Sequence, residues 1–433
     1  MTRSAKLFLQ ILIFGCLLGQ FGAVAAQGSE DGAEPRDPLI VAPLPTVIEI
    51  QGPVEDDGVG GMALTEEMDS LLVELLLQAS SDELPPEERQ DLADVGILID
   101  GDRIQVQIAI AAAGRQAVTE LVDALGGAVT GAGADERWLQ GWLPILSLAD
   151  LAQHPLVHYV RHPISLVTAD EPHGVVDSEG LSEFNVAGWR QSGRDGAGAH
   201  VAVIDGGFSG YEDLLGVELP ASINAVNFAD SGGADAIDGA TAHGLGVAEI
   251  VYDVAPGAEM SLLRINTNID LGEAVQWAIA HNVDIIATSI GWYNLGPGDG
   301  SGELADWVAR AEEAGILWVT SAGNDCERHW GGNFVDSDND SHHEYAPFTE
   351  VQIFGPAPDR SYLIPTGYPI VLYLRWSDWI DVDVDFNLSL MRFDGNQWQI
   401  VTRSQNMQNG SDGQTPTESI FYTTSGAAAP TAW

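Results

Sequence analysis

Three polar residues stand at positions from which side chains can do chemistry. Asp205 follows residues 201–204, a short apolar, β-branched run that predicts a buried strand of a parallel sheet. His243 opens a segment with helical spacing, and Asn324 lies just beyond another predicted strand at 316–322. Ligands of open α/β sheets bind at the carboxyl ends of the strands, so we expect these side chains to share one edge. A carboxylate, an imidazole and an amide in this order indicate one kind of hydrolase.

The segments around these residues resemble the motifs of the subtilisin-like serine peptidases (subtilases, peptidase S8). The family's Asp motif is similar to VAVIDGG at 201–207, its His motif to HGLGVAEI at 243–250, and its oxyanion-hole Asn motif to SAGND at 321–325. The strand end that lines the family's substrate cleft is similar to Ser289, Ile290 and Gly291. The resemblance covers residues 178–325 and departs from the family at Leu245, where Thr is usual.

The resemblance implies a role for each of these side chains. A serine hydroxyl is a poor nucleophile at neutral pH and needs a base within hydrogen-bond reach. His243 would be that base and later the acid, because imidazole titrates near working pH. Asp205 would hold the ring in its tautomer, and the Asn324 amide would donate to the oxyanion. The implied reaction is hydrolysis of polypeptides through an acyl-enzyme, with no required cofactor.

The family's nucleophile lies in a Gly-Thr-Ser-x-Ala-x-Pro motif that opens a helix, and this sequence contains no such motif. The nearest string, at 424–430, lacks the leading Gly and has its Pro one residue too late. We therefore expect the chain to end before its nucleophile. Two alternatives remain open: an inactive pseudopeptidase that acts as an extracellular binding module, and a rearranged site that uses Ser425.

The charge of the chain excludes several classes of partner. The formal net charge is −47, from 64 acidic and 17 basic residues, and Lys6 is the only lysine. Binding phosphates requires Lys and Arg, so we expect neither nucleic acid nor an anionic membrane as a partner. Because 45% of the residues are hydrophobic, we expect a globular protein with acidic residues on its surface, and the charge does not indicate disorder.

The first 26 residues predict a secretory signal peptide. Arg3 and Lys6 charge its start, residues 7–18 are mostly apolar, and residues 23–25 fit small-x-small cleavage. A membrane anchor, or lipidation at Cys16, is the alternative. We expect a secreted, extracellular or periplasmic protein.

Between the predicted signal peptide and the Asp motif, three segments differ in composition and in the pattern of apolar residues. Residues 27–102 form an acidic leader with one helix at 65–79, where apolar residues recur at helical spacing. Residues 103–163 alternate as β-α-β-β-α-β, a ferredoxin-like α+β unit, and 164–183 form a linker. Subtilisin-like peptidases commonly carry such a unit as a propeptide, so the resemblance implies an intramolecular inhibitor; an unrelated small domain is the alternative.

Residues 184–330 predict the α/β core. Strands are expected at 200–204, 260–265, 283–290 and 316–322, and helices at 184–192, 243–252, 271–281 and 302–314. Strands that alternate with amphipathic helices give a doubly wound parallel sheet.

Residues 331–433 change to alternating apolar positions and predict a β-sandwich or jelly-roll domain, inserted before the missing Ser motif. Within it, Asp336, Asp338 and Asp340 recur at every second position, and such oxygen ligands suit Ca²⁺. A solvated acidic loop is the alternative, so the metal site stays open.

Overall fold

The computed structural model describes residues 6–13, 46–51, 66–80, 85, 89, 92–93, 97–133, 136–167, 178–229, 237–239, 241–324, 329–345, 352–353, 367, 369–393 and 398–424. The chain divides into two compact units. Unit 1 combines Met1–Val95 with Glu327–Trp433, and unit 2 is Gly96–Cys326. Each is considered by itself below.

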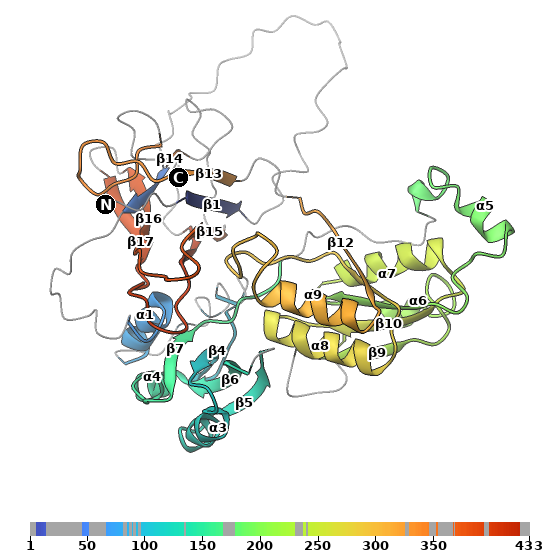
Figure 1. Ribbon diagram of the computed structural model, residues 1–433, viewed down its shortest axis with the longest axis horizontal. Coiled ribbons are helices and arrows are strands. Elements are labelled where there is room, and N and C mark those ends of the chain that lie inside the picture. Colours follow the sequence, from blue (N-terminus) through green and yellow to red (C-terminus); the bar gives the residue numbers. More distant parts are fainter. Residues whose placement is uncertain are drawn as a thin grey trace, which may run out of the picture. The chain divides into compact units, whose positions relative to one another are not determined.

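The centre of unit 2 is a five-stranded sheet in the order β12-β11-β8-β10-β9 (Figure 1). All of its paired strands are parallel. The strands are β8 (His200–Asp205), β9 (Asn224–Asn227), β10 (Glu259–Arg264), β11 (Ile285–Thr288) and β12 (Leu317–Thr320). The parallel sheet predicted from the sequence is therefore present, and β9 is a strand that the sequence analysis did not predict.

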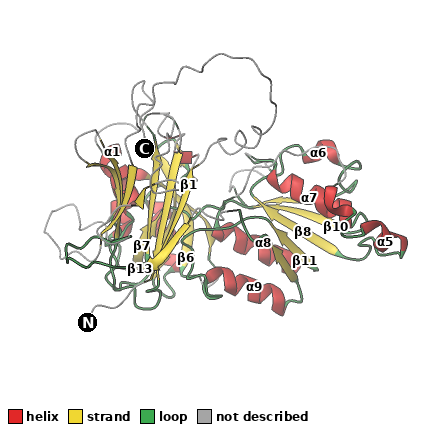
Figure 2. Cartoon of the chain, turned by 90° about the horizontal axis from the view of Figure 1, so that it is seen from above, coloured by secondary structure: helices red, strands yellow, loops and turns green. Residues whose placement is uncertain are grey.

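Helices cover both faces of this sheet. The helices of this part of the chain are α5 (Val186–Gln191), α6 (Tyr211–Leu214), α7 (His243–Val254), α8 (Asn268–Ala280) and α9 (Glu303–Glu313), after a short 3-10 turn, η3 (Glu179–Leu181). Alternation along β8 sends Ala202 and Ile204 into one core cluster, with residues of α8 and α9, and Val203 into another, with residues of α7. Figure 2 shows α7 on one side of the sheet and α8 and α9 on the other. All strands of the sheet thus end at one edge, between two helical layers.

Unit 2 begins with a second, antiparallel sheet in the order β3-β4-β6-β5, with β7 paired to β4. Its elements are β3 (Ile99–Asp100), β4 (Arg103–Ile110), α3 (Arg115–Ala124), β5 (Ala128–Ala132), β6 (Trp138–Pro144), η2 (Ile145–Ser147), α4 (Leu148–Ala152) and β7 (Val157–Arg161). From β4 onward they follow the predicted β-α-β-β-α-β order. Gln105 and Gln107, two polar residues of β4, are buried.

Unit 1 contains two four-stranded antiparallel sheets, in the orders β13-β1-β15-β18 and β14-β2-β16-β17. Its elements are β1 (Lys6–Ile13), β2 (Thr46–Gln51), α1 (Ser70–Ala79), β13 (His329–Asn333), β14 (Gln352–Ile353), β15 (Pro369–Trp376), β16 (Asn387–Phe393), β17 (Trp398–Ser404) and β18 (Thr417–Thr423). One apolar cluster joins residues of β1, β15, β16 and β18, so the two sheets share a core.

Two strands of these sheets come from the start of the chain. β1 lies within the predicted signal peptide and β2 within the predicted flexible leader, and the sequence analysis expected no strand in either. The predicted helix at 65–79 is present as α1 and begins later, because Asp69 caps it by accepting a hydrogen bond from the backbone N–H of Leu72 at 2.8 Å. The domain boundaries and the signal peptide stay predictions. Among the described residues, no helix has the length and apolar character needed to cross a membrane.

Candidate active site

Asp205 is the last residue of β8, which is buried along its whole length. The flanking strands β10 and β11 pair with β8 on either side, so Asp205 lies at the carboxyl edge in the middle of the sheet. Its carboxylate Oδ1 accepts a hydrogen bond from the backbone N–H of Gly206 at 2.8 Å. The chain leaves the sheet here, which places the carboxylate where ligands of parallel sheets bind.

His243 is the first residue of α7, and its imidazole lies against Asp205. The distances from His243 Nδ1 to the two Asp205 carboxylate oxygens are 3.0 and 2.9 Å. An ionised carboxylate can only accept, so this contact places the ring proton on Nδ1. The side chains are 8% and 0% exposed, so water competes little for the bond. The structure therefore brings together the acid and the imidazole that the sequence placed 38 residues apart.

Two glycines allow α7 to begin this close to the end of β8. A Cβ on Gly244 would lie 2.6 Å from the Asp205 Cβ and 2.7 Å from the Gly207 carbonyl oxygen. A Cβ on Gly207 would lie 2.5 Å from the Thr241 carbonyl oxygen. The Gly244 N–H donates to the Gly207 carbonyl at 3.0 Å, which joins the two segments directly. Close backbone approach explains these two residues, whereas a Cβ on Gly206 would meet only the Leu166 side chain, at 3.1 Å.

Burial and hydrogen bonding shift the pKa of the Asp205 carboxyl in opposite directions. Burial raises the pKa of its carboxyl above the usual range, while the hydrogen bond and the charge of His243 and the Gly206 N–H lower it. The net direction is upward, because the loss of water outweighs the donors. Since the negative charge of the carboxylate is poorly solvated, a positive charge on the neighbouring ring is the species that best stabilises it.

Asn324 follows β12 at the same edge of the sheet, and its side chain is exposed. β12 is an outer strand here, and Leu317 and Val319 are 59% and 51% exposed. The described contacts do not bring Asn324 against Asp205 or His243. Asp325 and Cys326, like the Ser425 string from residue 425 onward, lie outside the described residues.

Residues 289–291 follow β11 and bind a second segment of the chain through backbone hydrogen bonds. The Val167 N–H donates to the Gly291 carbonyl at 2.9 Å, and the Gly291 N–H donates back at 3.2 Å. On the other side of this segment, the Leu166 N–H donates to the Asn266 carbonyl at 2.9 Å, and the Asn268 N–H donates to the Ile164 carbonyl at 3.3 Å. Residues 164–167 thus lie as an extended, antiparallel strand between the ends of β10 and β11. The Leu166 side chain packs on the core cluster that includes Ile290.

A buried polar network lies where β4 and β6 pack on the start of α8, and sequence analysis missed it. Gln140 Nε2 donates to Asp270 Oδ1 at 2.9 Å, and Thr267 Oγ1 donates to Gln140 Oε1 at 2.9 Å. Gln107 Nε2 donates to Asn268 Oδ1 at 2.8 Å. Burial raises the pKa of Asp270 to about 6, against hydrogen bonds from the backbone N–H groups of residues 266 and 267 and from side chains. A visible signal was the Thr267-x-x-Asp270 pattern, which forms a capping box on α8.

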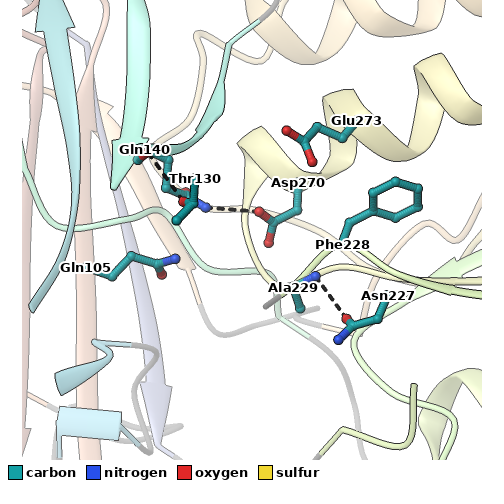
Figure 3. Close-up of a pocket in the computed structure, with 8 residues that line it drawn as sticks. All are labelled: Gln105, Thr130, Gln140, Asn227, Phe228, Ala229, Asp270 and Glu273. Atoms are coloured by element: carbon teal, nitrogen blue, oxygen red, sulfur yellow. Dashed lines mark hydrogen bonds between the residues drawn. The ribbon is translucent and has the colours of Figure 1, made fainter. Parts of the chain in front are cut away.

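A small polar cavity of about 100 Å³ adjoins this network (Figure 3). It is lined by Gln105, Thr130, Gln140, Asn227, Phe228, Ala229, Asp270 and Glu273. Figure 3 shows the Gln140 amide directed at Asp270, with Glu273 on the next turn of the same helix. Gln105 Oε1 and Asn227 Nδ2 are buried without a hydrogen-bond partner among the described residues. An unpaired acceptor and an unpaired donor in one polar cavity suit water molecules.

The three aspartates suggested as Ca²⁺ ligands do come together in unit 1. Carboxylate oxygens of Asp336, Asp338 and Asp340 lie within 4.8 Å of one another. The loop also uses them internally, because the Asp340 and Ser341 N–H groups donate to the Asp336 carboxylate at 3.2 Å. Asp338 and Asp340 are exposed, and exposed acidic groups gather in this way without an ion, so the Ca²⁺ assignment stays a prediction.

Comparison with known proteins addresses the segment that contains the Asp–His pair. Residues 196–349 match the model of the subtilase family of peptidases. This matched range is called the subtilase segment below. It contains both residues of the pair, Asn324, and Ser289, Ile290 and Gly291.

Two curated proteases are similar to part of this chain. Minor extracellular protease Epr of Bacillus subtilis (strain 168) is 29% identical over 205 residues, which are 41% of this chain and 30% of that protein. A thermostable alkaline protease of Halalkalibacterium halodurans is 31% identical over 152 residues, which are 34% of this chain and 41% of that protein. The chain spans less than half the length of either relative.

Among solved structures, the epidermin leader peptide processing serine protease (EpiP) of Staphylococcus aureus is similar at 15% identity and a TM-score of 0.37. The match covers 52% of this chain and 61% of that chain. At this level of likeness no argument about the subtilase segment rests on it.

Proposed function

We propose that the chain belongs to a secreted serine endopeptidase in which Asp205, His243 and Asn324 serve catalysis. The observation that carries the proposal is the contact of His243 Nδ1 with the buried Asp205 carboxylate, at 2.9 Å. A carboxylate in that position fixes the ring so that Nε2 is the nitrogen available as a base. An Asp–His pair is the arrangement that this chemistry requires. Here it lies at the carboxyl edge of a parallel sheet, in a range that matches the subtilase model.

The reaction would proceed through an acyl-enzyme. His243 Nε2 would take the proton of a serine hydroxyl as the oxygen attacks the peptide carbonyl, and would then give that proton to the leaving amine. Asp205 would stabilise the imidazolium that forms between these steps. Asn324 would donate its side-chain amide to the oxyanion of the tetrahedral intermediate. This sequence contains no Gly-Thr-Ser-x-Ala-x-Pro motif that would supply the serine.

Substrate would bind as an extended strand along Ser289, Ile290 and Gly291. Support comes from residues 164–167, which make backbone hydrogen bonds to Gly291 on one side and to residues 266 and 268 on the other. Backbone pairing of this kind binds a peptide without regard to its sequence, and side-chain pockets then add selectivity. We infer that residues 103–163 are a propeptide and that residues 164–167, at the start of the linker, occupy the substrate position, so that the propeptide acts as an intramolecular inhibitor.

The buried network between this region and α8 supports the same inference. Gln140 and Gln107 bind Asp270, Thr267 and Asn268 through side-chain hydrogen bonds. Buried polar groups that are paired specify one docked arrangement, because other arrangements leave them unpaired. The antiparallel sheet would therefore hold the inhibitory segment in one register at the cleft.

The first test is to read the gene beyond codon 433 and to express the protease with the segment found there. A Gly-Thr-Ser-x-Ala-x-Pro motif ahead of a predicted helix supports the proposal. With this form, His243→Ala should abolish hydrolysis of a fluorogenic peptide, whereas His281→Ala, which changes an exposed histidine bound to the Trp277 carbonyl, should keep it. A stop codon directly after Trp433, or full activity in the His243 variant, would contradict the proposal; the stop codon would favour a binding module.

A further inference from the structure

Unit 1 contains a carboxylate inside its shared core. Glu418 lies on β18 and pairs in register with Leu374 of β15. Both side chains are completely buried, and Leu374 belongs to the apolar cluster between the two sheets. Burying a carboxylate costs free energy unless its charge is compensated. The groups around Glu418 therefore determine what must compensate its charge.

Neutral donors surround Glu418. The Asn406 backbone N–H donates to its Oε1 at 2.8 Å, and the Ser404 hydroxyl donates to its Oε2. The side-chain amide of Gln408 also donates to it. These groups satisfy lone pairs of the carboxylate but do not cancel its charge.

A second carboxylate, Asp385, lies close enough to Glu418 for the two negative charges to repel each other. Gln408 bridges them, because its backbone N–H donates to Asp385 while its side-chain amide reaches Glu418. Asp385, Gln408 and Glu418, which these interactions connect, are called the buried acidic cluster below.

Two oxygen atoms of this cluster lack a hydrogen-bond donor among the described residues. They are Asp385 Oδ1 and Gln408 Oε1, and both atoms are buried. The Gln408 side chain is only 3% exposed, so bulk water does not satisfy its oxygen. Both unpaired atoms are acceptors, which distinguishes this cluster from the polar cavity beside Asp270, where one unpaired atom is a donor. Unpaired acceptors beside two repelling carboxylates favour a positively charged occupant.

We propose that Asp385, Gln408 and Glu418 bind a calcium ion inside unit 1. Ca²⁺ prefers six to eight oxygen ligands and accepts carboxylate, side-chain amide and water oxygens in flexible geometry. The three side chains supply that chemistry, and a divalent ion balances the two negative charges. Zn²⁺ fits less well, because the set offers no nitrogen or sulfur, and Mg²⁺ demands a stricter octahedron. This site is separate from the exposed loop of Asp336, Asp338 and Asp340.

Trp376 provides a spectroscopic reporter beside the proposed ion. Its Nε1 donates to the Val384 carbonyl at 3.0 Å, and its ring packs on Phe386 with centroids 5.2 Å apart. These two residues flank Asp385 in sequence, so the indole lies next to the site. A terbium ion, which replaces Ca²⁺ at oxygen sites, should therefore emit when this tryptophan is excited.

The test titrates Tb³⁺ into the metal-free 433-residue chain, follows emission on tryptophan excitation, and then displaces Tb³⁺ with Ca²⁺. We expect one saturable signal that Ca²⁺ reverses. Asp385→Asn and Gln408→Leu should each weaken Ca²⁺ binding by about tenfold or more, since affinity follows ligand number and charge. The triple variant Asp336→Asn, Asp338→Asn, Asp340→Asn is the matched control and should keep the signal. Circular dichroism shows that each variant compared is folded.

Three results would each overturn the proposal. The first is the absence of a saturable site, and the second is a site that is lost in the triple variant but kept in Asp385→Asn and Gln408→Leu. The third concerns Trp376→Phe, which we expect to dim the Tb³⁺ emission several-fold and to leave Ca²⁺ affinity, measured by calorimetry, within about twofold. Undiminished emission in that variant would place the ion elsewhere.

Discussion

Two of the buried aspartates of unit 2 have partners of different chemistry. Asp205 is fully buried against the imidazole of His243, and the carboxylate of Asp270 is almost as buried against the amide of Gln140 and the backbone N–H groups of Asn266 and Thr267. Burial raises the pKa of both carboxyls. Only the partner of Asp205 can exchange a proton near neutral pH, because amides and hydroxyls do not titrate there.

This difference in partners gives the two aspartates different roles, proton chemistry for Asp205 and positioning for Asp270. Asp205 faces a titratable ring at the carboxyl edge of the parallel sheet. Asp270 caps α8 and binds the antiparallel sheet through Gln140. A raised pKa alone therefore does not identify a catalytic group, and the partner decides what a buried carboxylate does.

The largest expected difference between the two aspartates is in catalysis. In an active form of the protease, Asp205→Asn should lower kcat/KM by about 10⁴-fold, because the amide stabilises the wrong tautomer of His243. Asp270→Asn should leave kcat/KM of the mature enzyme within about tenfold, since Asp270 orients no reacting group. Steady-state kinetics on one fluorogenic peptide measures both, and equal losses would remove the distinction.

Asn324 should show the next largest effect. Asn324→Ala should lower kcat by roughly 100- to 1000-fold with little change in KM, because its amide would bind charge that exists only in the transition state. Asn409→Ala, in the loop before β18 of unit 1, is a control of the same residue type. A loss confined to KM would assign Asn324 to ground-state binding.

The Asp–His pair and the sheet that carries it could be predicted from the sequence because the patterns that indicate them are local. An apolar run that stops at Asp205, and glycines next to both residues, are readable in a short window. The Asp270 network was missed because Gln107 and Gln140 look like ordinary solvent-facing residues of half-buried strands. Their burial depends on packing against α8, more than 120 residues away.

The same limit applies to unit 1. Its core was predicted from alternation within 331–433, yet β1 and β2 come from the first 51 residues and enter its sheets by long-range pairing. Glu418 reads as a polar residue in an alternating strand, and nothing nearby in the sequence indicates its burial next to Asp385. Long-range contacts of this kind have no local pattern.

The next expected effect is a difference between the wild type and Asp270→Asn in how stability depends on pH. Its carboxyl has a pKa of about 6 in the folded protein against 3.8 without burial, so the folded form holds the proton more tightly. Its contribution to stability is therefore present below about pH 4, falls as the pH rises to about 6, and is level above that. The change is on the order of 3 kcal/mol. Urea unfolding of wild type and Asp270→Asn at pH 4, 5, 6 and 7 measures it, and parallel curves would contradict this assignment.

A smaller effect is expected from Gln140. Gln140→Leu removes the donor to Asp270 and the acceptor of the Thr267 hydroxyl, so the free energy of unfolding should fall by about 1–3 kcal/mol. Gln116→Leu is the matched control, because Gln116 makes its hydrogen bond to Glu120 at the exposed surface of α3, and its cost should stay below about 0.5 kcal/mol. Equal costs in urea unfolding would show that the buried network contributes nothing specific.

The central claim is that Asp205 fixes the proton of His243 on Nδ1 and leaves Nε2 as the base. Nitrogen-15 NMR of the ring, in the 433-residue chain at a pH where the imidazole is neutral, measures the tautomer directly. We expect the Nδ1–H form in the wild type and loss of that form in Asp205→Asn. An Nε2–H ring in the wild type, or a tautomer that Asp205→Asn does not change, would contradict the account.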